Sequence, residues 1–192
     1  MLEAIQGIDW PGVDALVTLS NLAFSTGGAV LLGLVFAVAA GVLRRRDLLV
    51  QLGVVIVLRL AGQVLKPIFD SPRPGVEFQP DPELVSSTLG YPSGHAYTAT
   101  IVATMLIVFV SVLDLSRAAR WVTAITAVLI TVLALIARIH IGAHWPSDTL
   151  GGVLFGLATV GAMQLVVRLL AAPDAGIDPA PATSSTDRLP DA

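Results

Sequence analysis

Long apolar runs alternate with short polar breaks along most of this chain. Each run approaches the roughly 20 residues that a helix needs to cross the hydrocarbon core of a bilayer. The pattern predicts five membrane spans, at 24–43, 48–65, 96–113, 119–137 and 149–170. We therefore expect an all-α fold, a polytopic membrane bundle of five or six helical spans.

The two ends of the chain differ from this central pattern. Residues 1–23 form a predicted N-terminal segment, in which 11–23 is short, amphipathic and begins with Pro11. This stretch either lies along the membrane interface or extends the first span, and the sequence leaves both open. Residues 172–192 are rich in Pro, Ala, Ser, Thr and Asp, a composition that predicts a disordered tail. A single transmembrane domain is expected between the two, at 24–171.

Composition supports the membrane assignment. Charged residues make up 13% of the 192 residues, whereas a soluble domain carries roughly 25%. The chain has no cysteine, which excludes disulfides and cysteine-ligated metals. A net charge of −3 gives no reason to expect a nucleic-acid partner.

The basic residues predict the orientation of the spans. Most of them fall where the positive-inside rule indicates the cytoplasm, namely Arg44, Arg45, Arg46, Arg117, Arg120, Arg168 and Arg188. Lys66, Arg73 and Arg138 then lie on the opposite side. Arg59 falls inside the second span, seven residues before Lys66 and on the same helix face. It either snorkels or bonds to a neighbouring span, or it supports a site at Lys66 from deeper in the bundle.

Three polar breaks carry candidate chemistry, and the first and third of them supply three cations. Lys66 supplies a point charge, while Arg73 and Arg138 supply planar forks that can each grip two oxygens of a phosphate. Alone, the same three residues would be typical of anchors for lipid headgroups. In company with the two breaks described next, they favour a phosphate-binding site.

The second break is Pro92-Ser93-Gly94-His95, directly before the third span. Ser93 is placed to cap the helix, and Gly94 can offer its backbone N–H at close approach. The free N–H groups and positive dipole end of a helix start favour an anion. His95 adds a titratable group that can act as a general acid there.

The third break places Asp148 four residues after His144. An Asp bonded to one imidazole nitrogen fixes the tautomer and raises the basicity of the other nitrogen, which prepares His144 to act as a nucleophile. The alternative for this pair is a simple helix cap. His140, His144 and Asp148 would form a metal site on one continuous helix, but Gly142 and Pro146 argue against such a helix. No metal and no cofactor are therefore expected.

These three breaks resemble the signature of the type 2 phosphatidic acid phosphatase family. Lys66, Arg73 and Pro74 match its first motif, residues 92–95 its second, and Arg138, His144 and Asp148 its third. One position departs from the family pattern, because Ala137 stands where the family has Ser. The resemblance covers roughly residues 25–170 and implies a helical membrane bundle.

The resemblance also implies roles for the motif residues. His144 would be the nucleophile that forms a phosphohistidine, Asp148 would orient it, and His95 would protonate the leaving group and later activate water. The phosphate-binding cradle would consist of Lys66, Arg73, Ser93, Gly94 and Arg138. No metal would be needed.

The predicted function is hydrolysis of lipid phosphates or diphosphates by an integral membrane enzyme whose site faces away from the cytoplasm. Polyprenyl diphosphates such as undecaprenyl diphosphate, phosphatidylglycerol phosphate and phosphatidic acid are the expected substrates, and a bacterial plasma membrane is the expected location. The alternative is a protein that binds or transports lipid phosphates with the same pocket but without turnover. Oligomeric state cannot be read from the sequence.

Overall fold

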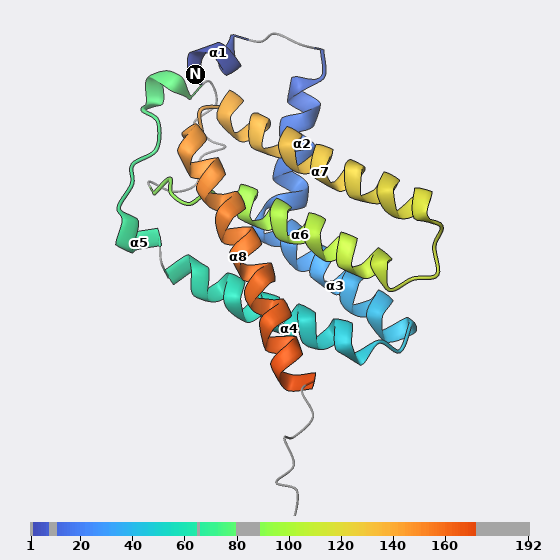
Figure 1. Ribbon diagram of the computed structural model, residues 1–192. Helices are drawn as coiled ribbons and strands as arrows, with labels where there is room; N and C mark the ends of the chain where they lie inside the picture. Colours follow the sequence, from blue (N-terminus) through green and yellow to red (C-terminus); the bar gives the residue numbers. More distant parts are fainter. Residues whose placement is uncertain (1, 8–10, 65, 80–88, 172–192) are drawn as a thin grey trace, which may run out of the picture.

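The computed structural model describes residues 2–7, 11–64, 66–79 and 89–171, and these residues are mostly helical (Figure 1). Within these ranges there is no β-strand, and extended pairing is limited to an isolated antiparallel bridge between Pro72 and Leu89. The expected disordered tail lies outside the described residues. The helices are α1 (Leu2–Gln6), α2 (Val13–Phe24), α3 (Thr26–Val42), α4 (Arg46–Val64), α5 (Lys66–Phe69), the short 3₁₀ turn η1 (Val76–Phe78), α6 (Gly94–Ser111), α7 (Arg117–His140) and α8 (Pro146–Ala171).

Four helical stretches in the described part of the chain are long and apolar enough to cross a membrane. They cover 46–69, 94–111, 117–140 and 146–170, within a few residues of four predicted spans. A fifth candidate is the pair α2–α3, whose two helices pass the same test together but are bent by 62°. The predicted all-α membrane bundle is thus confirmed, with four or five candidate spans among these residues.

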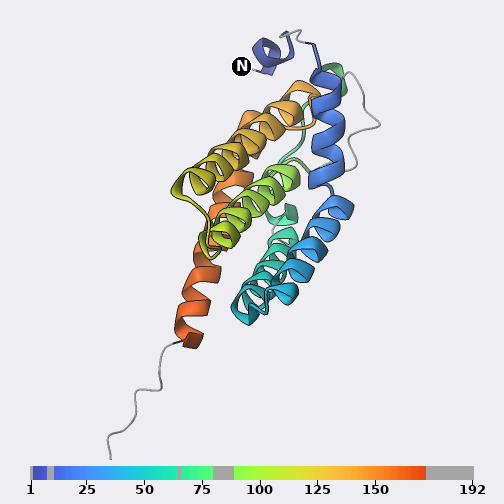
Figure 2. The same cartoon turned by 90° about the vertical axis from the view of Figure 1, so that its right-hand side faces the viewer.

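The first predicted span differs from the structure near its start. α2 ends at Phe24 and α3 begins at Thr26, with Ser25 extended between them. The hydroxyl of Ser25 accepts a hydrogen bond from the backbone N–H of Gly28 at 3.2 Å, so it caps a new helix. A Cβ at Gly28 would collide with the backbone of Leu22 and Ala23, which explains why the bend needs glycine there. Segment 11–23 is therefore a separate helix at an angle to α3, packed against α6 and α7 (Figure 2).

α6 is the centre of the bundle, because it packs on both α7 and α8 (Figure 1). Small residues allow α6 and α8 to approach closely, as they do in many membrane helix pairs. A Cβ at Gly152 would lie 2.6 Å from the carbonyl oxygen of Ser93, and one at Gly156 would lie 2.7 Å from Cβ of Thr100. The N-terminus of α8 is consequently held against the N-terminus of α6, where the backbone N–H of Ser93 donates to the carbonyl of Asp148 at 2.9 Å.

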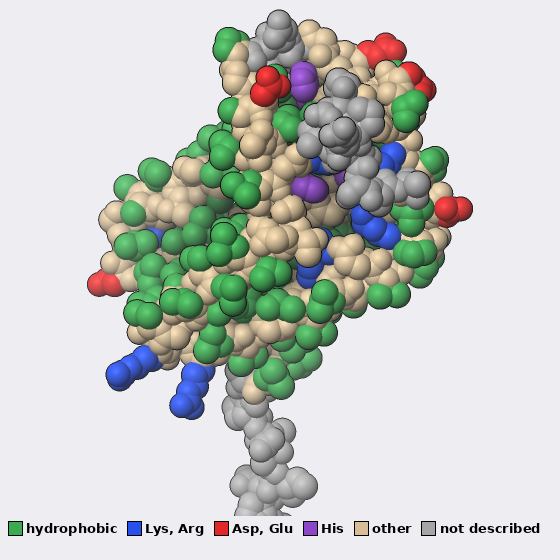
Figure 3. Space-filling model, turned by 180° about the vertical axis from the view of Figure 1, so that it is seen from behind, with side chains coloured by type: hydrophobic (Ala, Val, Ile, Leu, Met, Phe, Trp, Pro, Cys, Tyr) green, Lys and Arg blue, Asp and Glu red, His purple; other side chains and the backbone are tan. Residues whose placement is uncertain are grey.

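Basic side chains mark the opposite end of the bundle. In the α3–α4 turn, Arg45 Nη1 donates to the carbonyl of Val112 at the end of α6, at 3.4 Å. Arg120 donates to the carbonyl of Leu113 at 3.0 Å. The two turns that were predicted to be cytoplasmic therefore lie together at one end. Figure 3 shows histidine and basic side chains gathered in the upper part of the molecule, other basic side chains protruding at the lower end, and hydrophobic side chains over much of the surface between.

Candidate active site

The three motifs meet around one cavity at the end of the bundle away from the α3–α4 turn. Lys66 begins α5, Arg73 follows in a loop, Gly94 and His95 form the first turn of α6, Arg138 lies in the last turn of α7, and His144 lies between α7 and α8. The cavity has a volume of about 210 Å³, and all six of these residues line it. Helix ends and short connections thus assemble residues that are up to 78 positions apart in sequence, from Lys66 to His144.

His144 is held on both sides of its ring. Nδ1 lies 3.4 Å from Oδ2 of Asp148, and Nε2 lies 3.1 Å from Nη1 of Arg73. A guanidinium can only donate, so Nε2 carries the lone pair and Nδ1 carries the proton. Nδ1 is close to the carboxylate but does not form an aligned hydrogen bond with it. Asp148 is itself fixed, because its Oδ2 accepts the backbone N–H of Trp145 at 2.9 Å. The neutral tautomer that this arrangement favours exposes the basic nitrogen beside the cations.

The surroundings keep His144 uncharged at neutral pH. Burial lowers the pKa of His144 to about 4, Asp148 opposes this shift, and the positive charges of Arg73 and Arg138 add to it. The residue is only 1% exposed. The expectation that Asp148 makes the ring more basic describes one of these effects, and burial outweighs it. An uncharged imidazole keeps the lone pair that a nucleophile requires.

The start of α6 presents Gly94 and His95 to the cavity, but not Ser93. The Ser93 side chain is fully buried at 0% exposure, and its hydroxyl accepts the backbone N–H of Ala96 at 3.4 Å as the helix cap. Ser93 was predicted in the phosphate cradle, and it is not among the residues that line the cavity. His95 does line it, and its buried Nε2 has no hydrogen-bond partner within the described part of the chain.

Two of the three predicted cations, Arg73 and Arg138, are placed by bonds to other elements. Arg73 donates to the carbonyl of Ala143, next to the nucleophile candidate. Burial lowers the pKa of the Arg73 guanidinium while the Asp148 carboxylate raises it. Arg138 is 3% exposed, and its Nη1 donates to the side-chain oxygen of Asn21 on α2. Sequence reasoning missed Asn21, although a polar residue next to Ser20 on an amphipathic segment was a signal available there.

Arg59 also lines the cavity. Its Nη2 donates to Oγ1 of Thr98 at 3.3 Å, and its guanidinium lies 4.6 Å from the centre of the Tyr97 ring. The side chain therefore points into the bundle and not toward lipid. The predicted bond to a neighbouring span and the predicted support for the site are both compatible with this position.

His140 takes no part in the cavity wall. Its Nδ1 lies 3.3 Å from the carbonyl of Ile5 on α1, and its own carbonyl accepts from the side chain of Gln6 at 3.1 Å. α7 ends at His140 and α8 begins at Pro146, so the spacing of His140, His144 and Asp148 is not carried by one helix. Among the described residues no group of three or more His, Cys, Asp or Glu side chains is placed to hold a metal ion.

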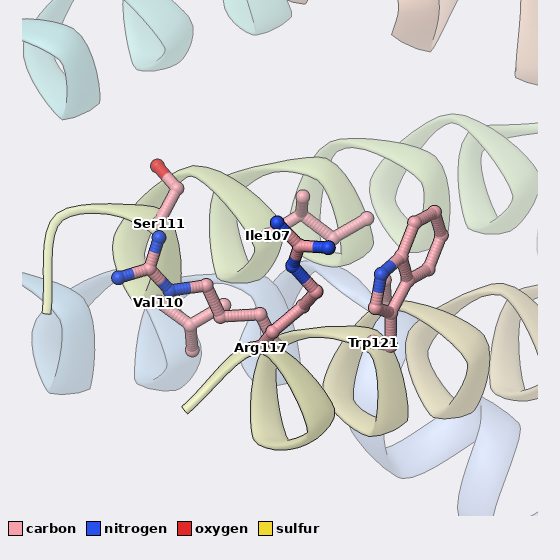
Figure 4. A pocket seen from close by; sticks show the side chains of 7 residues that line it. Ile107, Val110, Ser111, Arg117 and Trp121 are labelled. Atoms are coloured by element: carbon pink, nitrogen blue, oxygen red, sulfur yellow. The ribbon is translucent and has the colours of Figure 1, made fainter. Parts of the chain in front are cut away.

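A second cavity, of about 260 Å³, lies at the other end of the bundle between α6 and α7. Figure 4 shows Arg117 and Trp121 of α7 beside Ile107, Val110 and Ser111 of α6. Its lining contains no histidine and no acid, so it lacks a nucleophile paired with an orienting carboxylate. Residues from all three motifs line the cavity of His144 instead.

The fold and the cavity define a class of protein, helical membrane bundles with a cationic, histidine-containing pocket at one end. The PAP2 superfamily model matches residues 47–170, and the chain belongs to this superfamily. The matched region contains all three motifs, and α2 with Asn21 lies before it. The protein is an integral membrane protein.

A curated relative and a solved structure, both from Bacillus subtilis, are similar to the chain. Phosphatidylglycerophosphatase B of strain 168 is 33% identical over 100 residues, which are 52% of this chain and 47% of that protein. The match thus spans about half the length of that relative. The crystal structure of a transmembrane PAP2 type phosphatidylglycerolphosphate phosphatase superposes with a TM-score of 0.73 at 26% identity, over 88% of this chain and 83% of that chain.

Proposed function

We propose that this protein is a phosphatase that hydrolyses lipid phosphates or diphosphates through a covalent phosphohistidine at His144. One observation carries the proposal. In a cavity lined by four cations, Nε2 of His144 lies 3.1 Å from Nη1 of Arg73, and Nδ1 lies 3.4 Å from the carboxylate of Asp148. A protein that only binds phosphate needs the cations, but it does not need an oriented, uncharged imidazole.

The reaction would proceed in two displacements. Nε2 of His144 attacks phosphorus, the N–P bond forms as the bond to the leaving oxygen breaks, and protonated His95 gives that oxygen its proton. His95, now neutral, then takes a proton from water while the water oxygen attacks phosphorus. The P–N bond breaks, inorganic phosphate leaves, and both histidines regain their starting states.

The cations would stabilise the charge that develops on the phosphoryl oxygens. Lys66, Arg73 and Arg138 converge on the cavity, and the backbone N–H of Gly94 adds a donor at the start of α6. In this scheme Ser93 contributes as the cap that fixes Gly94. Fixed cations can supply the electrostatic stabilisation that a metal supplies elsewhere, so we expect activity without a divalent ion.

The relatives favour a phosphatidylglycerol phosphate substrate, since both are named for that activity. Phosphatidic acid and undecaprenyl diphosphate remain candidates on the sequence motifs. The distribution of basic residues favours a site that opens on the non-cytoplasmic face, because the Arg45 and Arg120 turns lie at the other end.

Phosphate release by the purified full chain from these three lipids, with and without EDTA, tests the proposal. We expect release that survives EDTA and is blocked by vanadate, which resembles a five-coordinate phosphoryl group. His144→Ala should abolish both release and the acid-labile phosphoenzyme. His140→Ala is the matched control, since His140 contacts α1 and not the cavity, and it should retain both.

Three outcomes would contradict parts of the proposal. Tight lipid-phosphate binding by the wild type without release would favour the binding or transport alternative. Activity lost in EDTA and restored by a divalent ion would refute metal independence. A phosphoenzyme that persists in the His144→Ala variant would refute the assignment of the nucleophile.

A further inference from the structure

The cavity has a second wall, made of residues outside the three motifs. These residues come from the α2–α3 bend and from one face of α4, and they are Phe24, Ser25, Thr26, Arg59 and Gln63. Arg59 is the charged member of this wall. A cation inside a membrane span is costly unless it has polar partners or a functional anion. Binding of the reacting phosphoryl group by the motif residues therefore does not explain why a cation lies in this second wall.

Arg59 reaches the cavity beside the start of α6. Its Nη2 lies 3.5 Å from the carbonyl of Gly94 and 3.3 Å from Oγ1 of Thr98, one turn further along α6. A methyl group at Gly94 would lie 3.6 Å from Nη2 of Arg59 and 4.0 Å from Nζ of Lys66. The two cations thus approach Gly94 together, although Arg59 is seven residues before Lys66, or about 10 Å along a helix.

The guanidinium of Arg59 is held in place and still has donors to offer. Its ring contact with Tyr97 and its bond to Thr98 fix the plane of the group. The amide of Gln63, turned with its oxygen inward, accepts hydrogen bonds from both Nη atoms. A guanidinium carries five N–H donors, so a bound anion can share this group with its protein partners. Such an oriented fork is suited to phosphoryl oxygens.

The position of Arg59 relative to His95 indicates which anion it meets. His95 follows Gly94 directly, and in the proposed reaction His95 gives its proton to the leaving oxygen. Arg73 contacts His144 in the motif wall, where the attacked phosphoryl group would lie. Arg59 instead contacts α6 at Gly94, which directly precedes His95 in the chain, and at Thr98.

From this geometry we infer that Arg59 is a specificity-determining residue that binds the second phosphoryl group of a diphosphate substrate. The inference rests on the proposed function. His144 would attack the terminal phosphorus, the P–O–P bridge would break, and His95 would protonate the oxygen of the departing lipid monophosphate. Arg59 would neutralise the charge on that departing phosphoryl group. A lipid monophosphate has no group to place there and gains nothing from Arg59.

Two substrates that differ by one phosphoryl group test this inference on the purified full chain, farnesyl diphosphate and farnesyl monophosphate. Removal of a charge-assisted bond should cost about 10- to 100-fold in kcat/KM. We expect Arg59→Gln to lose this factor with farnesyl diphosphate and to change little with farnesyl monophosphate. Arg59→Lys should recover part of the loss. Lys66→Gln, in the motif wall, should impair both substrates.

A milder variant covers the case in which Arg59→Gln fails to fold. Gln63 is exposed at the edge of the cavity beside Arg59. Gln63→Glu would pair a carboxylate with Arg59 and repel a second phosphoryl group. It should lower kcat/KM for the diphosphate selectively, while kcat/KM for the monophosphate serves as the internal control and should change little.

The outcomes separate this inference from the proposed function. A wild type that hydrolyses neither substrate would refute the function. A wild type that releases phosphate from the monophosphate but not from the diphosphate would refute only the role of Arg59. Equal losses on both substrates in folded Arg59→Gln, or no selective loss in Gln63→Glu, would also refute it.

Discussion

At the scale of single residues, the two histidines of the cavity differ in what surrounds them. His144 has Asp148 on one ring nitrogen and Arg73 on the other, whereas His95 has a buried Nε2 without a hydrogen-bond partner among the described residues. A held, uncharged imidazole is suited to attack, and an imidazole in the cavity lining with a ring nitrogen not bonded to the described residues is suited to transfer a proton. Different neighbours can thus give one residue type two roles.

This difference predicts a contrast between substrates for His95→Ala. Lipid phosphates release alkoxide-like groups that need a proton, so their turnover should fall by about 10²- to 10⁴-fold, the usual contribution of general acid–base catalysis. The leaving group of p-nitrophenyl phosphate is stable without protonation, so formation of the phosphoenzyme should be affected much less. Its hydrolysis would lack the base, and quenched single-turnover reactions should show the phosphoenzyme accumulating. Equal losses on both substrates, with no accumulation, would mean that the roles are assigned wrongly.

At the scale of elements, the site depends on a helix outside the region that matches the superfamily model. α2 packs against α6 and α7, and Asn21 accepts a hydrogen bond from the buried Arg138. Without that acceptor, Arg138 would be a buried cation with an unsatisfied Nη1, which costs about 1–3 kcal/mol or more. Asn21 is therefore a positioning residue for the cradle.

We expect Asn21→Ala to raise KM and lower kcat/KM by about 10-fold. Without the Asn21 acceptor, the Arg138 side chain would sample several conformations and bind phosphate less well. Asn21→Asp keeps an acceptor and should restore most of the activity, which a purely structural role for α2 would not predict. Steady-state kinetics on a lipid phosphate measure both. Ser20→Ala is the control on the same helix, since the buried hydroxyl of Ser20 has no hydrogen-bond partner in the described chain. An unchanged KM in Asn21→Ala would contradict the assignment.

At the scale of the whole molecule, charge is divided between the two ends of the bundle. The arginines of the α3–α4 and α6–α7 turns bond across to the end of α6, and the cations of the cavity lie at the other end. Apolar side chains cover the faces between, among them Leu31, Val57, Leu129 and Leu154. By the positive-inside rule, the end that carries the arginine-rich turns is expected on the cytoplasmic side.

Single cysteines in this cysteine-free chain test the orientation. Val76 and Asp114 are exposed and lie at opposite ends, in η1 and in the turn before α7. We expect an impermeant thiol reagent to label Val76→Cys in intact cells and to label Asp114→Cys only after the membrane is opened. Labelling of both positions in intact cells would refute the predicted topology.

The sequence by itself determined the spans and the set of charged groups available to the site. Apolar runs predicted four helices within a few residues, because the bilayer fixes how long a spanning helix must be. The motif residues were visible because charged and polar side chains are rare in such a chain. Bends were harder to predict, as the cap at Ser25 shows, since a serine in an apolar run is compatible with a continuous helix as well as with a break.

Only the tertiary structure decided which residues from different helices meet. No pattern in the sequence pairs Asn21 with Arg138, which are 117 positions apart, or places Arg59 beside Gly94. It predicted Ser93 as a phosphate ligand, whereas close packing of α8 on α6 leaves that side chain buried behind the cavity wall. Local spacing fixes the face of a helix on which a residue lies, but the partner of that face depends on how the helices pack against one another.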